Sequence, residues 1–394
     1  MSEGLTDAAS PFPPSRIAPV VRRVMVSDFR SYANLDLTVN SRLVVLTGDN
    51  GAGKTNLLEA LSLFGPGRGL RRADLSDMIR EGAPNGFSVS VLLDIGTDQV
   101  RLGTGADPAT PDMTVTRKAR IDGETVSSTT QFADYLRFVW LTPAFDGLFS
   151  GSAGDRRRFL DRLVLAVDPK HGARVNALER ALRSRNRLLE VERSDPSWLD
   201  AVEREVAETG VAVAAARQDT VARLVALITA GRDDASPFPW AMLAIEGPVE
   251  RELLSHAAID VEDFYRRQLR EHRSRDRAAG RTLIGPHVSD LAVRHGPKDV
   301  PAARSSTGEQ KALLVGLVLA HAQLVTDMSG IAPLVLLDEI AAHLDPRRRS
   351  ALFETLAALG SQVWMTGADR EAFRDLPFGA EQFHVHAGTV LPLA

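Results

Sequence analysis

The stretch LVVLTGDNGAGKTNLLEAL, residues 43–61, decides the fold of this 394-residue chain. An apolar run ends at Gly48, four residues lead to Gly53-Lys54-Thr55, and a helix-forming segment follows. This is the G-x-x-x-x-G-K-S/T pattern between a strand and a helix, in which glycines let backbone N–H groups converge on an anion. A glycine-rich turn without a ligand is the alternative, and the Lys-Thr pair argues against it. The stretch therefore predicts a nucleotide phosphate site in an α/β fold.

Each residue of this loop has an expected contact with Mg-ATP. Lys54 is expected to reach the β- and γ-phosphates, and Thr55 to offer its hydroxyl to Mg²⁺. The backbone of the other loop residues is expected to surround the phosphates. These residues are Gly48, Asp49, Asn50, Gly51, Ala52 and Gly53.

Composition limits the classes of protein to which the chain can belong. With 44% hydrophobic residues it can bury a large core, and the absence of cysteine excludes disulfides and fits a reducing, cytoplasmic compartment. No apolar run is long enough to predict a membrane span, and residues 1–18 are expected to form a flexible tail without a signal peptide. The net charge of −4 means that any nucleic-acid contact must use local basic patches.

The order of predicted elements indicates a split α/β domain. Apolar alternation predicts strands at 21–29, 33–39, 86–95, 99–104 and 113–121, which form an antiparallel layer beside the nucleotide loop. From 153 to 230 the sequence predicts antiparallel helices of about 30 to 40 residues each, separated at 194–198. Strands and helices alternate again after 280. We therefore expect a nucleotide-binding head at 19–150 and 281–394, with a helical lobe and short arm inserted at 151–280.

A second apolar run supplies the expected partner of the phosphate loop. PLVLLDEIAAHLD, residues 333–345, is typical of a buried parallel strand that ends at the active-site edge of a sheet. Asp338 is expected to hold Mg²⁺ through water, and Glu339 to act as general base toward the attacking water. An Asp-Glu pair after an apolar run is common by itself, so its significance depends on the loop upstream.

A third segment indicates the class of ATPase. RSSTGEQKALLVGLVLAHA, residues 304–322, places Ser306, Thr307, Gly308 and Glu309 at the start of an apolar helix. It resembles the signature motif of ABC-type ATPases, which binds the γ-phosphate held by a second subunit, although Thr307 stands where many signatures have glycine. The alternative is a helix cap in which Glu309 completes a capping box. Both readings are compatible, because a capped helix still presents amides to phosphate.

Among ABC-type ATPases, the chain resembles the RecF family of bacterial recombinational repair proteins. DRRRFLD and GPHVSDL are the specific elements, which neither a transporter ATPase nor a long-armed SMC protein is expected to carry. Three positions depart from the family pattern: the segment Ala144-Phe145-Asp146, the missing Q-loop glutamine, and the position of the switch histidine. Thr366 and Asp369 are the candidates for the γ-phosphate sensor at that last position. The resemblance rests on residues 26–37, 43–61, 140–163, 283–291, 306–314 and 334–345.

The resemblance implies an ABC-type head that works as an ATP-dependent DNA clamp. Two copies would form a homodimer with ATP between the phosphate loop of one and Ser306–Gly308 of the other, and would enclose double-stranded or gapped DNA. RecF-like proteins act with RecR and RecO to load RecA at single-strand gaps. A weak DNA-dependent ATPase activity, used as a switch, is implied. The alternatives are an SMC-like structural ATPase and an ABC transporter ATPase subunit.

Local basic patches are candidates for DNA contact. Residues 266–281 carry seven arginines against two acids, and further arginines cluster at 68–72, 156–162 and 183–187. Such runs are more often solvated helix faces than binding sites, and none of them implies sequence reading. His287 follows a Gly-Pro turn and has no second ligand at metal spacing, so a structural role is expected. The named DNA-binding candidates are Arg68, Arg71, Arg72, Arg273, Arg275, Arg277 and Arg281.

Overall fold

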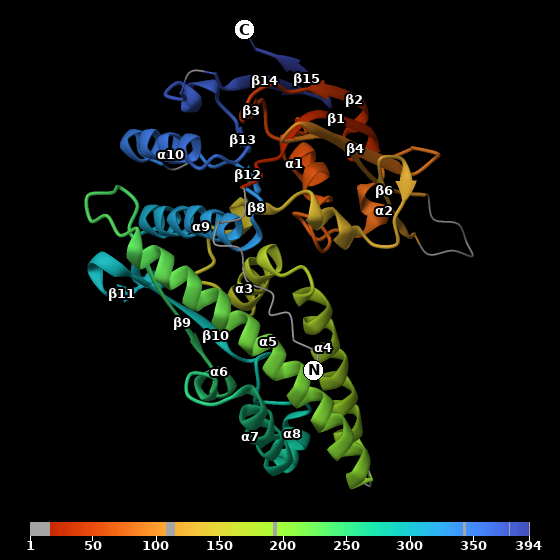
Figure 1. Ribbon diagram of the computed structural model, residues 1–394, viewed down its shortest axis with the longest axis vertical. Helices are drawn as coiled ribbons and strands as arrows, with labels where there is room; N and C mark the ends of the chain where they lie inside the picture. The colour runs from red at the N-terminus through yellow and green to blue at the C-terminus, as the bar shows by residue number, and fades with distance from the viewer. Residues whose placement is uncertain (1–15, 108–114, 192–194, 342–343, 378, 394) are drawn as a thin grey trace, which may run out of the picture.

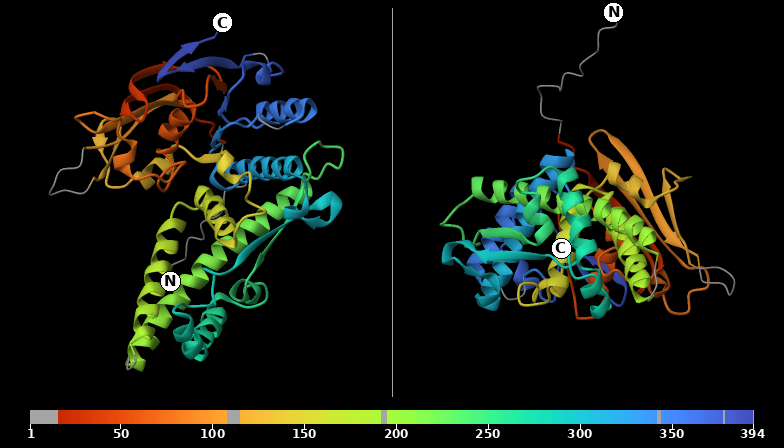
Figure 2. Two further views of the ribbon diagram at one scale, coloured as in Figure 1. Left: turned by 180° about the vertical axis from the view of Figure 1, so that it is seen from behind. Right: turned by 90° about the horizontal axis from the view of Figure 1, so that it is seen from below.

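The computed structural model describes residues 16–107, 115–191, 195–341, 344–377 and 379–393. The molecule is elongated, with the two large sheets at one end and a bundle of helices at the other (Figures 1 and 2). This is an α/β fold with a parallel core sheet, an antiparallel layer and a largely helical insertion. The predicted fold class is confirmed.

The core sheet gathers strands from both halves of the chain. Its order is β15-β14-β3-β13-β12-β8, and every neighbouring pair is parallel except β14 with β15. All residues of β3 and β12 are buried, as expected of parallel strands covered on both faces. The strands are β3 (Leu43–Thr47), β8 (Phe138–Leu141), β12 (Leu334–Leu337), β13 (Val363–Gly367), β14 (Glu381–His386) and β15 (Thr389–Pro392).

A six-stranded antiparallel sheet covers one side of the first helix. Its order is β2-β1-β4-β5-β6-β7, which matches the antiparallel layer predicted for residues 21–121. Apolar side chains of α1 (Lys54–Ser62) pack in one cluster with both sheets, so the helix that begins at the phosphate loop is held on two sides. The other elements here are β1 (Val20–Phe29), β2 (Tyr32–Thr38), β4 (Phe87–Ile95), β5 (Asp98–Ala106), β6 (Arg117–Ile121), β7 (Glu124–Thr125) and α2 (Leu75–Met78).

The inserted segment is mainly helical, with α4 packed against α5 and α5 against α7. The single helix predicted before the break near 194 is two helices, because Asp168 leaves the helical conformation before Pro169. Asp195 caps α5, which has Pro196 in its first turn. The helices are α3 (Ala153–Val167), α4 (His171–Glu190), α5 (Pro196–Ala230), α6 (Pro248–Glu252), α7 (Ala258–Glu271) and α8 (Arg273–Ala279).

A small antiparallel sheet was missed by the sequence reading. Its order is β11-β10-β9, and β9 lies inside the segment that was predicted to be helical. The pairing joins residues 241–246 to 290–295, on the two sides of the expected boundary at 280. Its strands are β9 (Ala241–Glu246), β10 (Asp290–His295) and β11 (Val300–Pro301), and the remaining helices are α9 (Thr307–Ser329) and α10 (Pro346–Ala358).

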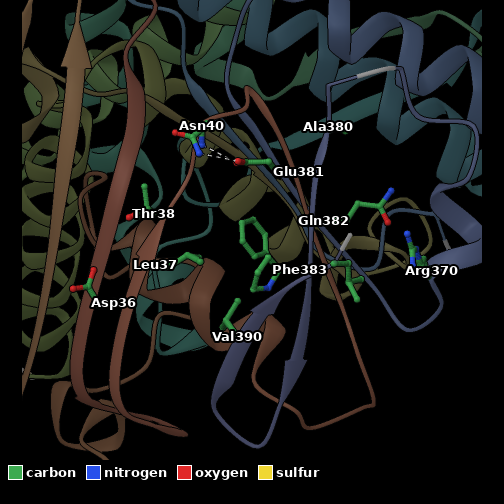
Figure 3. Close-up of a pocket in the computed structure, with 12 residues that line it drawn as sticks. Asp36, Leu37, Thr38, Asn40, Arg370, Ala380, Glu381, Gln382, Phe383 and Val390 are labelled. Carbon is green, nitrogen blue, oxygen red and sulfur yellow. Dashed lines mark hydrogen bonds between the residues drawn. The ribbon is translucent and has the colours of Figure 1, made fainter.

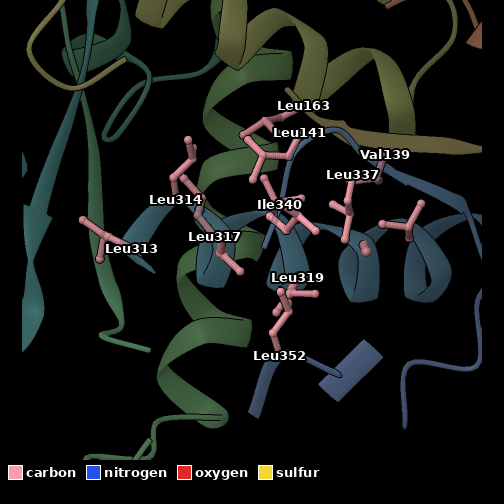
Figure 4. Packing of buried hydrophobic residues seen from close by; sticks show 14 of the residues in the cluster. Val139, Leu141, Leu163, Leu313, Leu314, Leu317, Leu319, Leu337, Ile340 and Leu352 are labelled. Atoms are coloured by element: carbon pink, nitrogen blue, oxygen red, sulfur yellow. The ribbon is translucent and has the colours of Figure 1, made fainter. Parts of the chain in front are cut away.

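The longest apolar helix of the C-terminal half, α9, forms the centre of the largest core cluster. Its leucines and valines belong to one cluster with residues of β8, β12 and α3, and Figure 4 labels Leu314, Leu317 and Ile340 in this cluster. Within the described residues, α9 is the one helix that is long and apolar enough to cross a membrane. Inside the protein, 67% of its most apolar stretch of 18 residues is buried. Burial inside the protein explains the apolar sequence of α9.

Candidate nucleotide site

The loop after β3 has the geometry of a phosphate cradle. Gly48, Gly51 and Gly53 all have positive φ angles, of 147°, 83° and 119°. A Cβ atom on Gly48 would lie 2.2 Å from the carbonyl oxygen of Val385, so only glycine fits there. Gly53 is the N-cap of α1, which places the helix N-terminus at the end of the loop. The positive end of the helix dipole therefore points toward the loop, where it would attract an anion.

The invariant lysine of the pattern, Lys54, is buried at the mouth of this loop. Its Nζ donates to the carbonyl oxygens of Gly48 at 2.6 Å and Asp49 at 3.0 Å, and lies 3.5 Å from Oε1 of Glu339. Its side chain is only 4% exposed. The ammonium group is thus held over the loop by neighbouring oxygens, in reach of a phosphate bound there.

Two threonines meet the aspartate that follows β12. Oγ1 of Thr55 donates to the carboxylate of Asp338 at 2.8 Å and 3.1 Å, and Oγ1 of Thr366 donates to the same carboxylate at 2.7 Å. Three segments that are far apart in sequence, α1, β12 and β13, therefore converge at one edge of the core sheet. A hydroxyl and a carboxylate at this separation are oxygen donors of the kind that Mg²⁺ prefers, so the side chains fit a magnesium ion.

The next residue, Glu339, has an unusual backbone. Its φ is 50°, in the left-handed region that non-glycine residues rarely adopt, and its backbone N–H donates to Oγ1 of Thr366 at 2.9 Å. The carboxylate is partly exposed, and its neighbour is the ammonium group of Lys54. Asp338 and Glu339 thus lie beside the phosphate loop, next to Thr55 and Lys54.

The start of α9 carries a complete capping box. Oγ of Ser306 accepts from the backbone N–H of Glu309, and Oε2 of Glu309 accepts from the backbone N–H of Ser306 at 3.1 Å. Lys298 donates to the other oxygen of Glu309 at 2.5 Å, and mainly for that reason the pKa of Glu309 falls to about 2. Among the described residues, no hydrogen bond joins Ser306, Thr307, Gly308 or Glu309 to the phosphate loop of the same chain. In the single chain, the start of α9 is therefore a capped helix end that is not joined to its own phosphate loop.

The segment at the Q-loop position links the sheet edge to two helices. Phe145 lies under the guanidinium of Arg162 from α3, with 3.9 Å from the guanidinium carbon to the ring centroid. Asp146 lies 3.7 Å from Nζ of Lys311 on α9. Burial lowers the pKa of Arg162 to about 9. Phe145 and Asp146 therefore connect this segment to α3 and α9.

Sequence reasoning missed the support of the loop by remote residues. The hydroxyl of Tyr32 donates to the carbonyl oxygen of Gly53 at 2.9 Å, and the backbone N–H of Gly388 donates to the carbonyl oxygen of Ala52 at 3.1 Å. Tyr32 is fully buried, and burial raises the pKa of its phenol. No local pattern could have indicated these contacts, because they join the loop to the first residue of β2 and to the turn after β14.

The arginines proposed to contact DNA fall into two groups. Arg68 pairs with Asp74, Arg71 bonds Asn56 and Glu59, Arg273 bonds Asp200 and Glu203, and Arg277 donates to the carbonyl oxygen of Leu189. Arg72, Arg275 and Arg281 are exposed, and none of the three has a side-chain hydrogen bond or ion pair with another described residue. In the 183–187 patch, Arg185 is fully buried and therefore faces the interior.

The two elements that are most specific to the resemblance are bound to each other. Arg156 forms a two-pronged ion pair with Asp290, at 2.7 Å for each bond, and Arg157 donates to the carbonyl oxygen of Ser289. Nε2 of His287 lies 2.9 Å from the carbonyl oxygen of Thr282, and burial lowers the pKa of His287. Through these bonds, DRRRFLD and GPHVSD connect α3 to the start of β10.

A surface pocket of about 560 Å³ lies at the other end of β3, between β2, β14 and β15 (Figure 3). Its lining includes Glu381, which pairs in register with Val44 rather than with the residues next to the phosphate loop. Both carboxylate oxygens of Glu381 accept hydrogen bonds from Asn40, as Figure 3 shows. The pocket therefore contributes nothing to the nucleotide site.

Comparison with known proteins identifies the family of the chain. The family model described as RecF/RecN/SMC N terminal domain matches residues 20–387. The DNA replication and repair protein RecF of Rhizobium rhizogenes is 54% identical over 370 residues, which are 94% of this chain and 98% of that protein. RecF of Rhizobium meliloti is 52% identical over 93% of this chain and 97% of that protein.

Solved structures with low sequence identity share the fold. A structure of the recombination mediator protein RecF-ATPrS in the RecFOR pathway has a TM-score of 0.84 at 21% identity, over 97% of this chain and 100% of that chain. An Smc head domain from Pyrococcus furiosus has a TM-score of 0.51 at 16% identity, over 95% and 96%. With relatives above 50% identity along nearly its whole length, the chain belongs to the RecF family.

Proposed function

We propose that this chain is an ATP-dependent DNA clamp of recombinational repair and replication-fork maintenance. The observation that carries the proposal is the meeting of Thr55, Asp338 and Lys54 with Glu339 beside a glycine cradle. Family membership supports the assignment to replication and repair, because the relatives are DNA replication and repair proteins. The reaction is hydrolysis of ATP, used as a switch rather than as metabolic catalysis.

ATP and Mg²⁺ are the proposed ligands of the cradle. The backbone of residues 48–53 would surround the phosphates, and Lys54 would exchange its bonds to the loop carbonyls for bonds to phosphate oxygens. Thr55 and Asp338 would hold the magnesium ion, Asp338 through water. Glu339 would accept the proton of the attacking water, and its contact with Lys54 supports slow turnover, because that contact must loosen first.

A second copy of the chain would complete the site. Ser306–Glu309 makes no hydrogen bond with its own phosphate loop in the described chain, yet the start of α9 presents backbone N–H groups and a helix dipole. These groups suit the γ-phosphate held by another subunit. ATP would therefore join two heads into a homodimer, and hydrolysis would separate them.

DNA is the proposed macromolecular ligand of the dimer. Double-stranded or gapped DNA would be bound through phosphate contacts, for which Arg72, Arg275 and Arg281 are the available candidates. RecR and RecO would be partners in loading RecA at single-strand gaps, by analogy with the family. The protein would act in the cytoplasm, with a head at 19–150 and 281–394 and a lobe at 151–280 that β9 ties to β10.

The rival functions fit the helical insertion less well. In the described residues, α4 has 20 residues and α5 has 35, so at 1.5 Å per residue they are about 30 Å and 50 Å long. An SMC-like tether needs arms many times longer. A transporter subunit would not need the ion-paired DRRRFLD and GPHVSD elements that anchor this insertion to the small sheet.

The proposal is tested by measuring ATP hydrolysis with and without a gapped duplex. We expect a low rate that gapped DNA raises, and a loss of about 100-fold or more in Asp338→Asn, because one of the groups that hold the metal ion is removed. Asp234→Asn is the matched control, since Asp234 is an exposed carboxylate paired with Arg232. The proposal would be refuted if gapped DNA does not change the rate of ATP hydrolysis, or if Asp338→Asn hydrolyses ATP as fast as the parent.

A further inference from the structure

The threonine at the end of β13 connects both acidic residues of the site. Thr366 is fully buried, and its Oγ1 donates to Oδ1 of Asp338 while it accepts from the backbone N–H of Glu339. These distances are 2.7 Å and 2.9 Å. One hydroxyl thus fixes the carboxylate of one residue and the backbone of the next.

This hydroxyl is not available to a phosphate. A hydroxyl has one proton to donate, and that of Thr366 is already donated to Asp338. The other candidate sensor, Asp369, uses its carboxylate to accept from the backbone N–H of Glu371 at 2.9 Å, and a carboxylate cannot donate to phosphate. Neither side chain therefore offers a free donor to the γ-phosphate.

The backbone at Glu339 needs such an anchor. A φ of 50° is unfavourable for a residue with a Cβ atom, and it persists only where neighbouring groups hold it. The hydrogen bond from the backbone N–H of Glu339 to Thr366 joins this peptide group to β13. From this backbone the Glu339 side chain extends toward Lys54, with Oε1 3.5 Å from Nζ.

We propose that Thr366 is a positioning residue that sets the metal-holding Asp338 and the base Glu339 relative to each other. It acts through these two residues and does not touch the nucleotide. The inference rests on the proposed function, because it gives Asp338 and Glu339 their roles in hydrolysis. It replaces the idea that Thr366 senses the γ-phosphate directly.

Two substitutions separate the hydroxyl from the shape of the side chain. Thr366→Val keeps the branched shape and removes the hydroxyl, whereas Thr366→Ser keeps the hydroxyl. We expect Thr366→Val to lower kcat for ATP by about 10- to 100-fold and to raise the Mg²⁺ concentration needed for half-maximal rate. KM for ATP and ATP-dependent dimerisation should change by less than about threefold, since the cradle is intact. Thr366→Ser should recover most of the rate.

Controls make the outcomes distinct. Thr326→Val removes another buried threonine hydroxyl, which bonds within α9 at 3.1 Å, and should leave the rate unchanged. Thr366→Ala replaces Thr366→Val if the valine variant does not fold. The positioning role is wrong if the parent hydrolyses ATP and Thr366→Val has the same kcat. It is also wrong if Thr366→Ser lowers kcat as much as Thr366→Val does. A parent without ATP hydrolysis refutes the proposed function itself.

Discussion

A buried arginine in the helical segment provides a quantitative test of the fold. The side chain of Arg185 on α4 is 0% exposed and pairs with Glu203 at 3.1 Å and Asp276 at 2.7 Å. It also donates to the hydroxyl of Thr282 and to the carbonyl oxygen of Leu269, both at 2.7 Å. This single guanidinium therefore links α4 to α5, α7, α8 and the segment that leads to GPHVSD.

We expect Arg185→Met to lower the free energy of unfolding of this segment by about 3 to 5 kcal/mol, because it leaves a buried charge without its partner. Glu203 keeps a second cation, Arg273, at 2.5 Å. Among the residues that the structure describes, the side chain of Asp276 keeps only the backbone N–H of Leu283, at 3.1 Å. The cost therefore arises mainly at Asp276.

The assay is urea unfolding followed by helical circular dichroism. The double variant Arg185→Met/Asp276→Asn should be more stable than Arg185→Met alone, because it leaves no buried carboxylate without a cation. Arg223→Ala removes an exposed ion pair with Asp219 and should cost less than about 1 kcal/mol. A loss below about 1 kcal/mol in Arg185→Met, with no coupling to Asp276→Asn, would refute this reasoning.

Two further predictions concern the phosphate loop and a core histidine. Gly53→Ala places a Cβ atom 2.8 Å from Oγ of Ser31 at a φ of 119°, so we expect at least about tenfold weaker binding of a fluorescent ATP analogue; unchanged affinity would contradict this. Burial lowers the pKa of His321 from 6.5 to about 4, so the folded state binds fewer protons and stability falls as pH drops from about 6.5 to 4. Between these pH values, the free energy of unfolding falls by about 3 kcal/mol. In thermal unfolding, His321→Leu should lack this part of the pH dependence. If the variant and the parent lose stability equally as the pH drops, His321 does not cause the loss.

Local patterns were enough to predict the nucleotide-binding half of the fold. The glycine spacing before Lys54, the alternation in residues 33–39 and the apolar run before Asp338 each encode the element in which they lie. These signals come from steric and burial requirements within a few residues, and they led to the predicted α/β class.

The features that the sequence did not predict depend on contacts between distant segments. The strand β9 has only a weak alternation, and it forms because β10, almost 50 residues later, pairs with it in register from Ala241 to Glu246. Arginine runs looked alike in sequence, yet Arg185 is buried and Arg275 is exposed, because their environments are set by tertiary packing. Tyr32 under the phosphate loop could not be found for the same reason.

The most direct test of the central claim is the sedimentation mass of Glu339→Gln with and without ATP. Removal of the base should trap ATP between two heads, so we predict a monomer that becomes a dimer only with ATP and Mg²⁺. Adding Ser306→Arg should restore the monomer, because the side chain at the start of α9 would then block the second subunit. A Glu339→Gln variant that stays monomeric under both conditions would contradict the shared-site mechanism.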